Sequence, residues 1–166
     1  MDYTHLHLVL NHFPIIGTLM GSLFLLYGIL RKNESLQKIS ITAIVIMAFI
    51  AIPVFLTGEP AEESVENISG ISEAVIEPHE EAAELAFWVM EITGIIGLAG
   101  LIFSKINTKI AKVLTTLLLI ASFASFVLMA RTGYLGGKIR HTELNGNTPV
   151  STANKETGTA EDDGDD

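Results

Sequence analysis

The chain contains no cysteine among its 166 residues. Without thiols it cannot by itself form a disulfide, an iron–sulfur cluster, a covalent CxxCH haem attachment or a cysteine-based zinc finger. Any metal ion or haem iron must therefore be held by His, Met, Glu or Asp. Basic residues are also scarce, with 10 Lys and Arg against 19 Asp and Glu. A net charge of −9 without a basic patch argues against nucleic-acid binding.

Charged residues make up only 17% of the chain, against 49% hydrophobic residues, and the two kinds are segregated. Apolar residues fall into four blocks, at residues 8–30, 39–57, 85–104 and 110–130. A run of about 18 or more such residues is long enough to cross a bilayer. No basic region precedes the first block, so we expect it to be retained. The sequence predicts an all-α polytopic membrane protein, with a four-transmembrane-helix bundle over residues 1–143.

Residues 144–166 differ from the rest in composition. They are rich in Asn, Gly, Thr and Ser, and residues 161–166 are all acidic except for one glycine. Such a segment buries too little apolar surface to offset the entropy of ordering. We therefore expect a disordered acidic tail, to which we assign no chemistry.

The connections between the blocks predict the orientation in the membrane. The connections after the first and third blocks are basic, whereas residues 58–84 carry nine Glu and no Lys or Arg. The positive-inside rule places the two basic connections in the cytoplasm. Arg131, Lys138 and Arg140 oppose this orientation, but the two basic connections agree. We expect a multi-pass protein of the inner (cytoplasmic) membrane, surrounded by the lipid bilayer, with both termini outside.

This topology brings all five histidines of the chain to the outer face of the membrane. Three of them open the first block, and His5 and His12 share one helix face whereas His7 and Asn11 share another. His79 precedes the third block, and His141 follows the fourth.

Two further segments predict where helices begin and end near these histidines. The Glu77-Pro78 pair is typical of a cap followed by a first-turn proline, so we expect the third long helix to start there. The Gly136-Gly137 pair predicts a break that ends the fourth helix at these glycines, ahead of His141. Pro14 lacks a backbone donor, so we expect a loosened turn around Asn11.

The first functional hypothesis is a b-type haem that transfers electrons near the outer face, with a redox partner protein there. Haem iron takes axial imidazoles from facing helices, and non-covalent haem needs no cysteine. The preferred axial pair is His12 and His79, whereas His7 and His141 are candidates for a second haem. Arginines suit the anionic propionates. The candidate haem-binding residues are His7, His12, His79, His141, Arg131 and Arg140.

The second hypothesis is a His/Glu site for a zinc, iron or copper ion. Imidazole suits all three ions, and carboxylates complete iron or zinc shells. The HxxHH boxes of membrane di-iron enzymes are absent. The candidate metal ligands are His7, His12, His79, Glu59 and Glu80.

The third hypothesis is a non-catalytic structural or assembly subunit, in a homo-oligomer or a larger complex. Glu91 lies inside the third block, where an unpaired carboxylate costs a few kcal/mol unless it faces the interior or pairs. Arg131 is the nearest cation by topology, and a partner helix is the alternative. The sequence identifies no nucleophile and no substrate pocket, so we assign no enzymatic activity.

Several of these segments resemble a known family. The His-x-x-x-x-His-Phe-Pro segment at residues 7–14, the histidine of the third helix and the Tyr134-Leu135-Gly136-Gly137 exit are similar to a bacterial four-helix membrane family, domain of unknown function 2231. The likeness spans residues 5–143. Relatives in that family occur fused to Rieske or cytochrome c modules, which implies redox work near the outer membrane face. The chain departs from the family's ending at Ile139-Arg140-His141.

Overall fold

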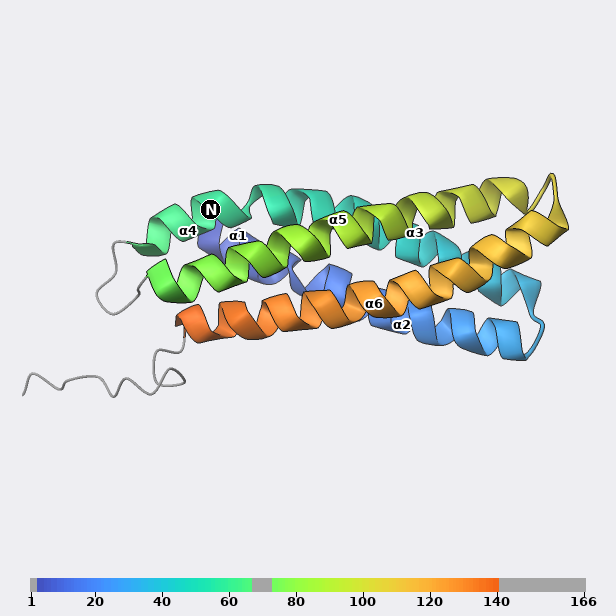
Figure 1. Ribbon diagram of the computed structural model, residues 1–166, viewed down its shortest axis with the longest axis horizontal. Helices are drawn as coiled ribbons and strands as arrows, with labels where there is room; N and C mark the ends of the chain where they lie inside the picture. The colour runs from blue at the N-terminus through green and yellow to red at the C-terminus, as the bar shows by residue number, and fades with distance from the viewer. Residues whose placement is uncertain (1–2, 67–72, 141–166) are drawn as a thin grey trace, which may run out of the picture.

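The computed structural model describes residues 3–66 and 73–140, and the regular structure there is entirely helical. The helices follow in chain order (Figure 1): α1 (Tyr3–Leu10), α2 (His12–Leu30), α3 (Glu34–Leu56), α4 (Gly58–Glu66), α5 (Glu73–Phe103) and α6 (Thr108–Arg140). The all-α prediction is confirmed for this part of the chain. The expected tail, residues 144–166, lies outside it.

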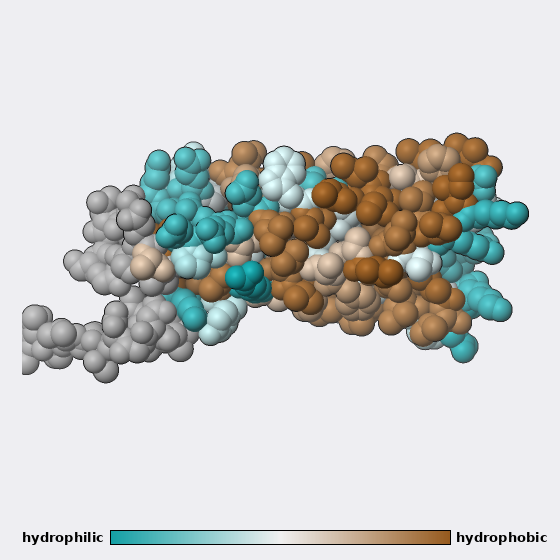
Figure 2. Space-filling model, in the orientation of Figure 1, coloured by the Kyte–Doolittle hydropathy of each residue, from teal (hydrophilic) through white to brown (hydrophobic). Residues whose placement is uncertain are grey.

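Four helical segments are long and apolar enough to cross a membrane, as predicted. They are Tyr3–Leu30, Glu34–Glu63, Ile76–Phe103 and Thr108–Ile139. Large apolar side chains such as Phe49, Ile95 and Ile120 are about two-thirds exposed on the outside of the bundle. Figure 2 shows the result, a broad apolar surface between two polar ends. An apolar surface of this extent is unusual for a soluble monomer.

The four long helices form a closed bundle in which each packs against two neighbours. Helix α3 lies against α2 and α5, and α6 lies against α5 and α2 (Figure 1). The short helices α1 and α4 pack together at one end, where the Thr4 hydroxyl donates to the Ala61 carbonyl at 3.4 Å. We call this the histidine end, formed by α1, α4, the start of α5 and the end of α6. The α2–α3 and α5–α6 turns form the opposite, basic end.

Asparagines set the two turns of the basic end. The Asn33 side chain accepts from the Leu36 amide at 3.0 Å and so caps α3. The Asn107 side chain accepts from the amides of Lys109 and Ile110 and caps α6 in the same way. An asparagine oxygen satisfies amides that have no carbonyl partner in the first turn. These caps explain why short connections suffice between neighbouring antiparallel helices.

The interior is held together by small residues and buried hydroxyl groups. The Ser22 hydroxyl donates to that of Ser122 at 2.8 Å, which joins α2 to α6. Thr93 and Ser125 share a second hydroxyl pair at 2.8 Å, which joins α5 to α6. All four side chains are fully buried. In an apolar solvent the hydrophobic effect does not drive helices together, so such hydrogen bonds and close contacts stabilise their packing instead.

Two predicted helix boundaries are wrong, and one is confirmed. Helix α5 begins at Glu73, so Pro78 lies inside it; the lost hydrogen bond falls near the helix start, where Ala74 is exposed. Helix α6 continues through Gly136-Gly137 to Arg140 instead of ending before them. Residues 58–66, expected in a long connection, form α4. The helix is interrupted at Asn11, as Pro14 predicts.

Candidate cofactor site at the histidine end

His7 is held against the end of α3. It lies on α1, is half-buried, and places its Nδ1 atom 3.0 Å from the Val54 carbonyl oxygen and 3.3 Å from the Thr57 hydroxyl. Val54 is in the last turn of α3, where carbonyls lack helical N–H partners. Because a carbonyl can only accept, Nδ1 carries the proton of this hydrogen bond. In the neutral ring Nε2 then carries a lone pair.

His79 is held in the same manner by a different helix. It lies in the second turn of α5, is half-buried, and donates from Nδ1 to the Thr132 carbonyl of α6 at 3.0 Å. One turn further along α6 is Gly136, where a Cβ atom would lie only 3.0 Å from the His79 Cε1 atom. Gly136 therefore permits close approach of the imidazole, and the glycine pair does not end the helix. The Nε2 atom of His79 is also left with a lone pair.

Both imidazoles lie at the histidine end of the bundle, although their sequence positions are far apart. Each ring is fixed through Nδ1 by a main-chain carbonyl, one from α3 and the other from α6. Histidines that bind a metal commonly use one nitrogen as the ligand and donate from the other to a carbonyl or carboxylate. The arrangement thus fixes two rings in a tautomer whose Nε2 lone pair could bind a metal.

Asn11 adds a buried acceptor close to His7. It lies one turn after His7 on the same helix face, and its Oδ1 atom is buried without a hydrogen-bond partner in the described structure. Buried polar atoms nearly always have a partner, so this oxygen indicates a donor supplied by water or by a bound group. The shared face of His7 and Asn11 was recognisable in the sequence. The carbonyls of Val54 and Thr132 have no sequence signal.

The other predicted haem ligands are not brought to the pair. His12 is exposed, and its Nδ1 atom is 2.8 Å from the Leu8 carbonyl of the preceding helical turn. Arg131 is exposed on α6. Arg140 is the last residue of α6, and its side chain is not among those described. His141 lies outside the described residues.

The predicted carboxylate ligands are at the same end but do not converge on the imidazoles. Glu59 and Glu80 are both exposed, and Glu80 is near enough to His79 to interact with its charge. Within residues 3–66 and 73–140, no three His, Asp or Glu side chains are grouped so that they could hold a metal ion. The described side chains therefore offer two nitrogen ligands rather than a complete shell for a bare ion.

Glu91 lies apart from this site, deeper along α5. Its Oε1 atom is buried and has no hydrogen-bond partner in the described part of the chain. Arg131, the cation expected to pair with it, therefore does not bind this oxygen. The carboxyl group occupies an apolar stretch of the bundle without a polar contact at that atom.

No protein-family model matches the chain, and no curated protein or solved structure matches it. The likeness to the four-helix family described above stays a prediction. The fold and the site define a class directly: an all-helical bundle of four long apolar helices that carries two oriented imidazoles at one end.

Proposed function

We propose that the chain is a multi-pass protein of the inner membrane, with the histidine end outside and the basic end in the cytoplasm. The broad apolar surface of the bundle and the length of its helices support membrane insertion. The charges support the orientation, because the two turns of the basic end carry Arg and Lys while the histidine end carries Glu. Both chain termini are then outside.

Within that protein, we infer that His7 and His79 would hold a haem b through their imidazole nitrogens. The observation that carries this proposal is the matched orientation of the two rings, each anchored through Nδ1 with Nε2 left to bind. A haem brings four equatorial nitrogens of its own and needs two imidazoles from the protein. A zinc site, in contrast, takes at least three protein ligands. We prefer His7 to His12 because His7 is half-buried at the bundle, whereas the His12 side chain is exposed.

Three further residues support the proposal. Gly136 lets the His79 ring pack closely against α6, and Asn11 offers a buried acceptor one turn after His7. Arg131, exposed on α6 at this end, is available to an anionic propionate. A haem bound here would supply one-electron chemistry, while the chain orients it and exposes it to a redox partner at the outer face.

The experiment is an optical spectrum of the detergent-purified protein, oxidised and then reduced with dithionite, with metal analysis of the same sample. We expect a Soret band and sharp reduced α and β bands. His7→Ala and His79→Ala should each abolish them, whereas His12→Ala and His5→Ala, which alter exposed rings, should not. Loss of the bands in His12→Ala alone would contradict the assignment.

A second candidate is a transition-metal ion held by His7 and His79 with a carboxylate. The observation in its favour is that Glu80 directly follows His79 in α5, so a carboxylate is available beside one of the two imidazoles. Stoichiometric zinc, copper or iron without visible haem bands would establish it. Protein that retains neither haem nor metal, when both are supplied during expression, would instead support a structural or assembly subunit.

A further inference from the structure

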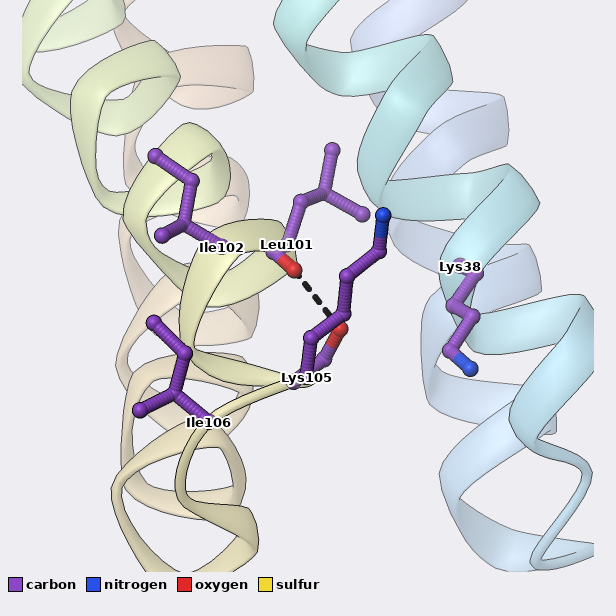
Figure 3. Close-up of a pocket in the computed structure, with 6 residues that line it drawn as sticks. Lys38, Leu101, Ile102, Lys105 and Ile106 are labelled. Atoms are coloured by element: carbon purple, nitrogen blue, oxygen red, sulfur yellow. Dashed lines mark hydrogen bonds between the residues drawn. The ribbon is translucent and has the colours of Figure 1, made fainter.

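An open groove lies between α3 and α5 at the basic end, opposite the histidines. Figure 3 shows it in close-up, and its volume is about 520 Å³. Its walls combine two amines with apolar side chains. The lining residues are Lys38, Leu101, Ile102, Ser104, Lys105 and Ile106.

The two lysines come from different elements and border the same space. Lys38 lies on α3, and Lys105 lies just past the end of α5 and extends toward α3 (Figure 3). No carboxylate of the described residues lines the groove; Glu34, one helical turn before Lys38, is not part of its wall. The Ser104 hydroxyl donates to the Leu101 carbonyl at 2.6 Å and so is already satisfied. The charged side chains that line the groove are therefore both cationic.

The remaining wall is apolar and exposed. Ile102 and Ile106 are 51% and 71% exposed, and they continue the apolar surface of the bundle up to the level of the lysines. In the proposed orientation this level is the cytoplasmic headgroup region. Cations above an apolar surface match a phospholipid, whose phosphate is anionic and whose acyl chains are hydrophobic.

We propose that this groove binds an anionic phospholipid, with the phosphate between Lys38 and Lys105 and an acyl chain along Ile102. A net negative headgroup is specified because two lysines line the groove and no described acid does. A zwitterionic lipid would bring a cation of its own into the same space. This inference rests on the proposed membrane location and orientation, but it does not depend on haem.

Native mass spectrometry of the full chain in detergent tests the proposal, with phosphatidylglycerol as the anionic lipid and phosphatidylcholine as the zwitterionic one. We expect tighter binding of phosphatidylglycerol. Lys38→Gln and Lys105→Gln should each weaken it about fivefold, and the double variant roughly 25-fold. Lys109→Gln is the matched control, since Lys109 is exposed at the same end and does not line the groove.

Three results would overturn the proposal: equal affinity for both lipids, a double variant that binds phosphatidylglycerol like the wild type, or an equal loss in Lys109→Gln. The mutated side chains are exposed, so helicity measured by circular dichroism should be unchanged in all variants. Cell fractionation separates this test from the proposed function. A chain recovered without detergent would overturn the membrane location itself, whereas a chain that lacks haem but binds the lipid would overturn only the haem assignment.

Discussion

His79 on α5 fits against Gly136 on α6 so closely that a single added methyl group has no room beside the imidazole. A Cβ atom at Gly136 would lie 3.0 Å from Cε1 and 3.2 Å from Nδ1 of His79. The same ring donates to the Thr132 carbonyl one turn earlier on α6. The orientation of the imidazole therefore depends on the absence of a side chain at Gly136.

Gly136→Ala should displace the His79 ring and weaken cofactor binding by about 10- to 100-fold, the range typical of groups that orient metal ligands. Gly137→Ala is the matched control, because a Cβ atom there meets nothing within 4 Å. The control should retain the cofactor and gain helix stability. Haem or metal content per protein, measured after purification, distinguishes the two. Equal retention in both variants would contradict the role of Gly136.

Asn11→Leu should stabilise the cofactor-free protein and weaken cofactor binding. Its buried Oδ1 has no partner in the described structure, so an apolar side chain of similar size should raise the free energy of unfolding of the cofactor-free protein by about 1 kcal/mol. If the bound group donates to this oxygen, the same change should lower cofactor retention. Thermal unfolding of both forms measures the two effects. A destabilised cofactor-free variant would contradict the interpretation.

The buried hydroxyl pairs should contribute modestly to stability. A double-mutant cycle of Ser22→Ala and Ser122→Ala should give a coupling energy of about 0.6 kcal/mol, the average for hydrogen bonds inside membrane bundles. The Ser22 and Ser125 cycle is the control, because each of these hydroxyls pairs with a different residue. Unfolding in mixed detergent micelles provides the free energies. Equal coupling in the two cycles would show that the hydrogen bond is not what is measured.

Glycine should be required at Gly94 but not at Gly100. A Cβ atom at Gly94 would lie 2.5 Å from the Ala48 Cβ atom, which is fixed to the α3 backbone, so α3 and α5 would have to separate. We expect Gly94→Ala to destabilise the bundle by about 1–3 kcal/mol. At Gly100 the closest atom is at 3.8 Å, an ordinary contact, and alanine should stabilise the helix by about 0.5–1 kcal/mol. The same unfolding assay compares them.

The sequence predicts the bundle well because each apolar block must satisfy its backbone as a helix. The interruption at Asn11 also follows from the local chemistry of Pro14. The helix ends predicted from Gly136 and Pro78 are wrong, because Gly136 permits close helix packing and Pro78 is tolerated inside α5. Such residues have several structural uses, and only the neighbouring helix determines which one applies.

The choice between the two histidine-bearing faces of the first segment could not be made from sequence. His5 and His12 lie on one face and His7 on another, as predicted, and it is the His7 face that packs inward. Residues on both faces are largely apolar, since the outside of this bundle is as hydrophobic as its interior. Hydropathy therefore carries little information about which face is buried.

The proposed shared role of His7 and His79 has a consequence for biogenesis. The two rings are contributed by the first and third long segments, and their carbonyl anchors by the second and fourth. In the proposed site, a nascent chain has one of the two imidazoles until the third segment is in place, and it lacks the Thr132 anchor until the fourth has followed. Cofactor insertion would then be the last step of assembly. A cofactor-bound molecule would be one in which all four segments have been inserted correctly.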